Sequence, residues 1–352
     1  MPSKRTVLVT GVSGNLGTTL LPFLSEFPVV GVDVRPPAGS SLARFEQIDL
    51  GREASCRRLI ELLRATKAQS VVHLAFVLDP QRAGVLDPED MWQINVAGTA
   101  RVMEAISVVN RSGGEIGQFI FPSSVAAYGP ETAGPVKEDA PLRAHTLPYA
   151  IHKRESDEVV RYRAEGLGDC RVYILRPHIF TGATVENYMV GALRGIPGGK
   201  SKRAARMRAE GKRLPLMLPR GAKYLEKRFQ FVHVDDMARL LTVLLYRPDT
   251  DPPVTVLNVA GRGEPIPIKR CAEIAGATIK RAPSRALFGS VLRYLWKFGI
   301  SSIPPQALPY LIGSYTMDTT QLQQFLGADY PRVIQYTVED ALRDSFNSGA
   351  RN

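Results

Sequence analysis

A short apolar segment that ends in three regularly spaced glycines restricts the fold of this 352-residue chain more than any other feature. Residues 6–10, Thr-Val-Leu-Val-Thr, are β-branched or aliphatic, as expected of a buried parallel strand. Gly11, Gly14 and Gly17 follow directly, and leucines then recur at helical spacing. Glycines between a strand and a helix permit a tight turn, a close approach of the backbone to a pyrophosphate and close helix–strand packing. The pattern predicts a dinucleotide-binding turn, because the start of the helix offers free N–H groups to an anion.

The rest of the amino-terminal half alternates between expected strands and helices. Strands are expected near 29–34, 45–49, 70–74, 118–121 and 171–175, and helices between 49 and 70, near 88–109 and near 149–164. Alternation of this kind predicts an α/β fold with a Rossmann-type, doubly wound parallel sheet that is covered on both faces.

After Pro177 the pattern changes, and glycine, proline and basic residues predominate. Further strands are expected at 229–234 and 255–259, separated by a helix at 237–246. Asp235 and Asp236 would cap that helix, and Thr337 would cap the last one. Two units are expected: a cofactor-binding Rossmann domain over 1–180, to which 229–260 returns, and a smaller carboxy-terminal α/β substrate lobe over 181–352.

Asp33 stands at the end of the second expected strand. A carboxylate at this place accepts hydrogen bonds from the ribose hydroxyls of an adenosine and repels a 2′-phosphate. NAD is therefore the expected cofactor, while Arg35, two residues later, leaves NADP open.

Tyr149 and Lys153 are four residues apart on an expected helix, and so lie one turn apart on one face. A free tyrosine has a pKa of about 10 and is a poor base at neutral pH. A lysine ammonium beside the phenol favours the phenolate, so the pair is expected to move a proton near neutral pH.

Further motifs follow in order along nearly the whole chain, except for the basic segment and about 280–312. They are Gly11-x-x-Gly14-x-x-Gly17, Asp49, His73-Leu74-Ala75, Asn95–Thr99, Ser123-Ser124, Tyr128-Gly129, Tyr149-x-x-x-Lys153, Arg176-Pro177, Val232–Asp236, Met317–Thr320 and Leu326-Gly327. With these motifs the chain resembles the extended short-chain dehydrogenase/reductase superfamily, specifically its NAD-dependent epimerase/dehydratase group.

The resemblance implies roles for individual residues. Tyr149 would be the acid/base on a substrate hydroxyl or carbonyl, Lys153 would hold the nicotinamide ribose, and Ser124 would hydrogen-bond the reacting oxygen. The residues implied in cofactor binding are Gly11, Ser13, Gly14, Asn15, Leu16, Gly17, Asp33, Arg35, Asp49, Leu50, Leu74, Ala75, Phe76, Asn95, Ser123, Tyr149, Lys153 and Pro177. The family also implies a homodimer.

Three departures from the family narrow the chemistry. Val125 and Ala126 follow Ser124, where the family's dehydratases have an acidic pair, so dehydration is disfavoured. Ile179 stands where nucleotide-sugar epimerases of the family usually have an asparagine, and Phe229 where they usually have a phosphate-binding arginine. A nucleotide diphosphate is then in doubt unless another basic segment replaces that arginine.

One such segment exists. The chain carries a net charge of +11, and residues 194–228 hold twelve basic and two acidic side chains, a net +10. This basic segment is expected to attract an anionic partner or surface, or else to be a solvated loop that aids solubility. Nucleic acid is not expected as a partner, because Tyr224 alone offers an aromatic ring among these charges.

Several classes of protein are excluded or disfavoured. The three cysteines, Cys56, Cys170 and Cys271, form neither a disulfide framework nor a metal-site spacing, so no metal is expected. The basic residues at 1–5 precede no long apolar run, so the chain is expected to be cytoplasmic. Residues 285–298 form a basic amphipathic segment, either a packed lobe helix or an interfacial helix that touches a membrane or shapes an apolar pocket.

Three functions stay open at this point. The first is an NAD(P)-dependent oxidoreductase or epimerase that acts by hydride transfer on a secondary alcohol of a nucleotide-linked sugar. The second is a dehydrogenase or reductase of a larger apolar alcohol or ketone, sterol-like or bound to an acyl carrier. The third is a non-catalytic NAD(P)-binding regulator, which the presence of Ser124, Tyr149 and Lys153 disfavours.

Overall fold

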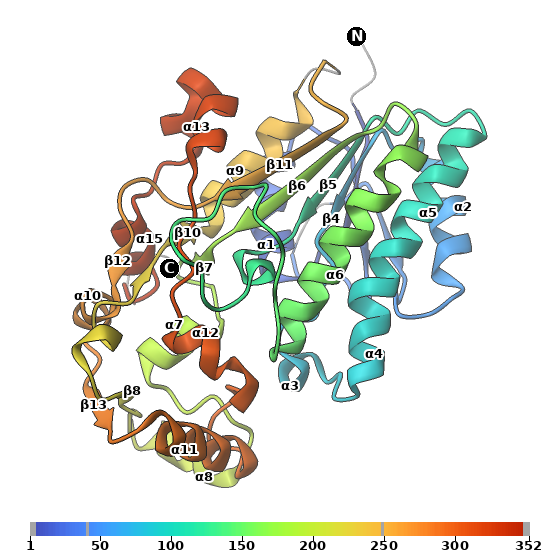
Figure 1. The fold of residues 1–352 in the computed structure, drawn as a ribbon. Helices are drawn as coiled ribbons and strands as arrows, with labels where there is room; N and C mark the ends of the chain where they lie inside the picture. The colour runs from blue at the N-terminus through green and yellow to red at the C-terminus, as the bar shows by residue number, and fades with distance from the viewer. Residues whose placement is uncertain (1–4, 40–41, 248–249, 348–352) are drawn as a thin grey trace.

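The computed structural model describes residues 5–39, 42–247 and 250–347. Its centre is a seven-stranded, wholly parallel sheet in the order β11-β6-β5-β4-β1-β2-β3 (Figure 1). The strands are β1 (Val7–Thr10), β2 (Val29–Asp33), β3 (Arg44–Gln47), β4 (Ser70–His73), β5 (Gln118–Pro122), β6 (Arg171–Pro177) and β11 (Val254–Val259). This confirms the predicted Rossmann-type α/β fold. Residues 1–4 of the basic amino-terminal segment lie outside the described residues.

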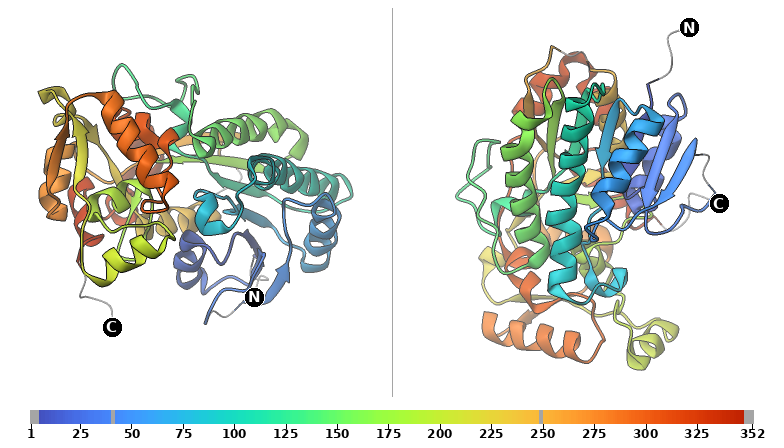
Figure 2. Two further views of the ribbon diagram at one scale, coloured as in Figure 1. Left: turned by 90° about the horizontal axis from the view of Figure 1, so that it is seen from below. Right: turned by 90° about the vertical axis from the view of Figure 1, so that its right-hand side faces the viewer.

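Helices cover both faces of the sheet. On one face lie α2 (Ser55–Thr66), α5 (Gly98–Arg111) and α6 (Pro148–Arg163), side by side in the right-hand view of Figure 2. In α5, Val102, Met103, Ile106 and Val109 are buried at the spacing of one helical face. On the other face α1 (Asn15–Leu20) packs on α9 (Val234–Leu245).

The remaining strands form three two-stranded sheets. The pairs are β7 (Ile179–Thr181) with β10 (Phe231–His233), β9 (Arg228–Phe229) with β12 (Ile266–Pro267), and β8 (Leu216–Pro219) with β13 (Ile279–Ala282). The other α-helices are α3 (Pro80–Ala83), α4 (Pro88–Trp92), α7 (Tyr188–Arg194), α8 (Lys202–Ala209), α10 (Ile268–Ala275), α11 (Arg285–Lys297), α12 (Leu308–Ile312), α13 (Thr320–Leu326), α14 (Tyr330–Val333) and α15 (Val338–Asp344). None of the described helices is long and apolar enough to cross a membrane.

The single strand expected at 229–234 is two strands that pair with different partners. Gln230, between them, is buried, and its side-chain amide accepts a hydrogen bond from the N–H of Met317 and donates one to its carbonyl. Because Gln230 makes these two side-chain hydrogen bonds, the strand of Phe229 pairs with β12 and the strand of Phe231 pairs with β7.

The helix expected over 88–109 is interrupted by a π-helical turn at Gln93–Ala97. Asn95 in this turn is fully buried, and its side-chain amide bonds both the N–H and the carbonyl of Val77. Its own carbonyl accepts hydrogen bonds from the hydroxyls of Thr99 and Ser156. Through these hydrogen bonds the π-helical turn connects the segment after β4 to α5 and α6. Turns of this kind are frequent at functional sites.

One of the two predicted helix caps is confirmed, and the other is wrong. Thr337 caps α15 through the N–H of Asp340, as expected. The cap of α9 is His233, whose Nδ1 accepts from the N–H of Asp235, and not the two aspartates. Asp236 is instead buried in the first turn and accepts hydrogen bonds from the backbone N–H groups of residues 335 and 336.

Candidate active site

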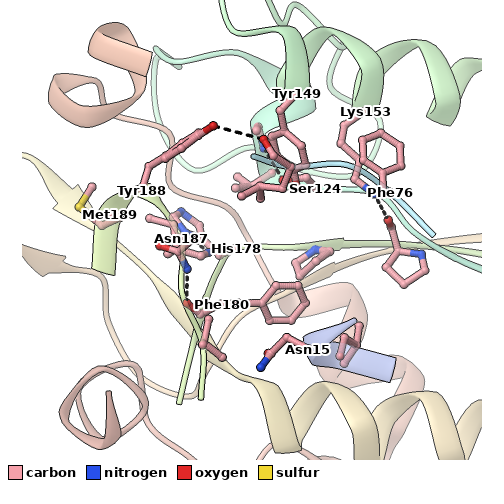
Figure 3. Close-up of a pocket in the computed structure, with 18 of the residues that line it drawn as sticks. Asn15, Phe76, Ser124, Tyr149, Lys153, His178, Phe180, Asn187, Tyr188 and Met189 are labelled. Atoms are coloured by element: carbon pink, nitrogen blue, oxygen red, sulfur yellow. Dashed lines mark hydrogen bonds between the residues drawn. The ribbon is translucent and has the colours of Figure 1, made fainter. Parts of the chain in front are cut away.

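A cavity of about 330 Å³ lies where the carboxyl ends of the parallel strands meet the carboxy-terminal elements (Figure 3). Its sheet side is made by the glycine turn after β1, Leu74 after β4, Ser123 and Ser124 after β5, and Pro177 at the end of β6. In doubly wound sheets this edge is where ligands bind.

The glycine turn approaches its surroundings so closely that side chains have no room. Gly11 has a φ of +69°, and a Cβ there would lie 2.4 Å from the backbone nitrogen of Ala75. At Gly17 a Cβ would lie 2.5 Å from the carbonyl oxygen of Gly11. No side-chain hydrogen bond caps α1, and Gly14, Asn15, Leu16 and Gly17 at its start line the cavity. A pyrophosphate fits this cradle.

A buried hydroxyl oxygen without a hydrogen-bond partner also supports the conclusion that a ligand fits this cavity. Ser123 is a residue of the cavity wall, and in the described structure its buried Oγ atom has no hydrogen-bond partner. An unsatisfied buried hydroxyl is costly, so a ligand that bonds it is favoured.

The residues predicted to bind the cofactor fall into two groups. Those that line the cavity are Gly11, Gly14, Asn15, Leu16, Gly17, Leu74, Phe76, Ser123, Tyr149, Lys153 and Pro177. Those that do not are Ser13, Asp33, Arg35, Asp49, Leu50, Ala75 and Asn95. Asp33 nevertheless adjoins the turn, since one of its oxygens accepts from the N–H of Ser13 at 2.9 Å and the other from that of Val34.

Ser124, just after β5, and Tyr149 and Lys153 of α6 converge on the cavity (Figure 3). Proline at the first position of α6 starts the helix directly before Tyr149, and Lys153 follows one turn later. The Oγ atom of Ser124 accepts from the N–H of Ala126 at 3.1 Å and also hydrogen-bonds Tyr149. The three side chains predicted to be catalytic therefore share one wall.

The predicted effect of Lys153 on Tyr149 is not observed. Burial raises the pKa of Tyr149 to about 12, opposed only by the hydrogen bond with Ser124. Burial also lowers the pKa of Lys153 to about 7, which the carboxylate of Asp157 opposes. The Nζ atom of Lys153 donates to the carbonyl of Pro122 at 2.6 Å and lies 3.6 Å from the ring centre of Phe76. Desolvation thus outweighs the attraction expected from the helical spacing.

His178 also lines the cavity, but it is not suited to carry a proton. Its Nδ1 accepts from the N–H of Ile179, and its Nε2 contacts the carbonyl of Tyr315. Burial lowers its pKa to about 3, so it stays neutral. No group of three or more metal-ligating side chains occurs among the described residues.

Sequence reasoning missed most of the wall opposite Tyr149. This wall comes from α7, α12 and the loops beside them, and its members include Val185, Tyr188, Met189, Ala307, Tyr310, Leu311 and Tyr315. Leu78 and Leu147 line the cavity from the segment after β4 and from the start of α6. One signal was available, because Asn187 precedes an apolar run and caps α7 through the N–H of Val190.

The basic segment 194–228, all of which the structure describes, contributes no residue to the cavity wall. Its helix α8 lies with α11 at one end of the molecule, seen from below in the left-hand view of Figure 2. The two are joined where the N–H of Ser201 bonds the carbonyl of Gly299. On α11, Phe288 and Leu292 are buried, while Leu287, Tyr294 and Phe298 just after it are exposed.

Solved structures of low sequence identity share the whole fold. They include MoeE5 in complex with UDP-glucuronic acid and NAD, 21% identical over 97% of both chains with a TM-score of 0.66. A UDP-Glc/GlcNAc 4-epimerase from Campylobacter jejuni is 20% identical, over 97% of this chain and 98% of that one, with a TM-score of 0.66. A UDP-glucuronic acid 4-epimerase from Bacillus cereus gives 20%, the same coverage and a TM-score of 0.65.

Sequence comparison identifies the family. Uncharacterized epimerase/dehydratases of Staphylococcus aureus, such as that of strain USA300, are 24% identical over 168 residues, 47% of this chain and 50% of the relative. The chain thus matches about half the length of these relatives. A model of the NAD dependent epimerase/dehydratase family matches residues 7–260. With this match and the glycine cradle described above, the protein belongs to the NAD-dependent epimerase/dehydratase family, and its cofactor is NAD.

Proposed function

We propose that the protein is an NAD-dependent oxidoreductase or epimerase that transfers a hydride at a secondary alcohol carbon. The observation that carries the proposal is that Ser124, Tyr149 and Lys153 share one cavity with the glycine cradle. Residues 1–180, with 229–260, would bind the cofactor, and 181–352 would bind the substrate. A non-catalytic regulator would need the cradle but not the three side chains.

In the proposed reaction the phenolate form of Tyr149 takes the proton of the substrate hydroxyl and becomes the neutral phenol, while the carbon loses a hydride. NAD, when bound, supplies the hydride acceptor. Ser124 would hydrogen-bond the reacting oxygen, and Lys153 would hold the cofactor ribose. Because Val125 and Ala126 carry no group that transfers a proton, loss of water is disfavoured.

The two forms of the reaction leave different products. If a ketone is released, absorbance at 340 nm should rise in proportion to turnover. If the hydride returns to the opposite face of the carbon, an isomer should accumulate without net NADH. A preparation that binds NAD yet gives neither product with any secondary alcohol, whether nucleotide-linked sugar or apolar compound, would contradict the proposal.

Two substrate classes compete for this site. The solved neighbours include proteins that bind or act on UDP-sugars, which supports a nucleotide-linked sugar. The apolar wall opposite Tyr149 supports a larger apolar alcohol or ketone. For the basic segment both predictions stay, a docking site for an anionic partner and a solvated loop that aids solubility. The homodimer stays a prediction of the family.

Replacing Ser124 by alanine should slow alcohol oxidation by about 10- to 150-fold at pH 8, since a hydrogen bond to a charged group contributes about 1.5–3 kcal/mol. The hydrogen bond from Ser124 lowers the pKa of Tyr149, so its loss raises that pKa and leaves less phenolate. The rise of the oxidation rate with pH should therefore shift to higher pH in Ser124→Ala. Ser112→Ala, which removes an exposed hydroxyl outside the cavity, is the control. Superimposable pH profiles of Ser124→Ala and wild type would refute the assignment.

A further inference from the structure

Resting on the proposed function, we infer that the substrate is an uncharged secondary alcohol or ketone with a bulky apolar body, and not a nucleotide diphosphate. The inference concerns the wall opposite Tyr149, formed by α7, α12 and neighbouring loops. In Figure 3, Tyr188 of α7 points toward Ser124 and Tyr149 from that side, with Met189 beside it. The space between the two walls is where the carbon that reacts must lie.

The tyrosines of this wall present rings and not free hydroxyls. The hydroxyl of Tyr188 donates to the carbonyl of Leu78, and that of Tyr315 donates to the carbonyl of Tyr310. The hydroxyl of Tyr310 contacts the carbonyls of Ala126 and His145. With these bonds made inside the protein, what faces a ligand is aromatic and aliphatic surface.

The wall also lacks the cations that a diphosphate needs. Among the described residues that line the cavity, Lys153 is the one cationic side chain, and Glu186 adds a carboxylate. Lys153 already bonds the carbonyl of Pro122 and lies over the ring of Phe76. The glycine cradle can offer backbone N–H groups to the pyrophosphate of NAD, but the described residues of the wall opposite Tyr149 form no such cradle. Moving two further phosphate charges from water against that wall without cationic partners is strongly unfavourable. An uncharged ligand meets no such cost.

The basic segment does not supply replacement phosphate ligands. Arg208 donates to the carbonyls of Pro197 and Gly199, and Arg194 donates to that of Ser345. Arg228 is turned to the carbonyl of Pro265 on the exposed side of β9, while its neighbour Phe229 is 1% exposed and meets Tyr315 edge-on. These three side chains are thus bonded elsewhere in the protein, and none of the twelve basic residues of the segment lines the cavity.

The test compares ligands on the complex of the wild-type protein with NADH, by isothermal titration calorimetry. Decan-2-ol, UDP and UDP-glucose are suitable, because none of them can be reduced by NADH and the complexes do not react. We expect decan-2-ol to bind at least about tenfold more tightly than UDP or UDP-glucose, because the phosphates of the charged ligands lose their hydration when they bind. Equal or tighter binding of UDP or UDP-glucose would overturn the inference, as would failure of decan-2-ol to bind.

A charge placed in the wall gives a second readout. Met189→Lys should weaken binding of decan-2-ol by at least about tenfold, since a buried ammonium then faces the apolar ligand. Met207→Lys makes the same change in α8, outside the cavity, and should leave binding unaltered. Decan-2-ol binding that Met189→Lys leaves unaltered would overturn the inference. Titration of NADH checks that each variant is folded, and a wild-type protein that does not bind NADH would refute the proposed function itself.

Discussion

Tyr149→Phe is expected to abolish nearly all turnover, with kcat lower by about 10²- to 10⁴-fold, while the affinity for NAD changes little. The change removes one oxygen atom, and that oxygen is the proton carrier in the proposed reaction. The ring of Tyr149, which meets Phe76 edge-on at 5.8 Å, is retained. Steady-state kinetics at 340 nm or product analysis gives kcat, and NADH fluorescence titration gives the affinity.

Tyr162→Phe is the matched control, because Tyr162 belongs to the same helix and its side chain is 88% exposed. It should retain the activity of the wild type. If Tyr149→Phe also retained that activity, Tyr149 would not be the proton carrier.

Asp157→Asn should destabilise the fold by about 3–5 kcal/mol, because it leaves a buried guanidinium without its counter-charge. Arg176 and Asp157 are both completely buried and are joined by two hydrogen bonds of 2.9 Å. Arg176 also donates to the hydroxyl of Tyr128 and to the carbonyl of Glu138. The guanidinium of Arg176 in β6 therefore holds α6 and the segment after β5 together. Denaturant titration would give the free energy of unfolding.

Glu158→Gln, an exposed neighbour of Asp157 on α6, should change that free energy by less than about 0.5 kcal/mol. The double variant Asp157→Leu with Arg176→Met removes both charges and should recover much of the loss. A loss below about 1 kcal/mol in Asp157→Asn would mean that Arg176 does not depend on this partner. Because α6 carries Tyr149 and Lys153, loss of NAD binding should accompany the loss of stability.

The sheet and the cofactor cradle could be predicted from sequence because their signals are local. The run Val7–Thr10 is buried throughout and ends at a glycine with positive φ, as the pattern of strand and glycines predicts. Helical spacing likewise predicted that Tyr149 and Lys153 share a face, and both line the cavity.

The remainder of the site depends on contacts between distant segments, which spacing does not encode. The π turn at Asn95 follows from hydrogen bonds to Val77, and the division of 229–234 follows from the pairing of Gln230 with Met317. The pKa of Tyr149 depends on burial by residues from elsewhere in the chain, so its direction could not be inferred from the neighbouring lysine. The wall that faces it comes from α7 and α12, which lie far apart in the sequence.

The most direct test is a crystal structure of the protein with NADH. The expected result is a pyrophosphate against Gly11, Gly14 and the start of α1, with the nicotinamide in the cavity beside Tyr149 and Ser124. A dinucleotide bound elsewhere, or one whose nicotinamide lies outside this cavity, would contradict the claim that the phenol and the cofactor act on the same carbon.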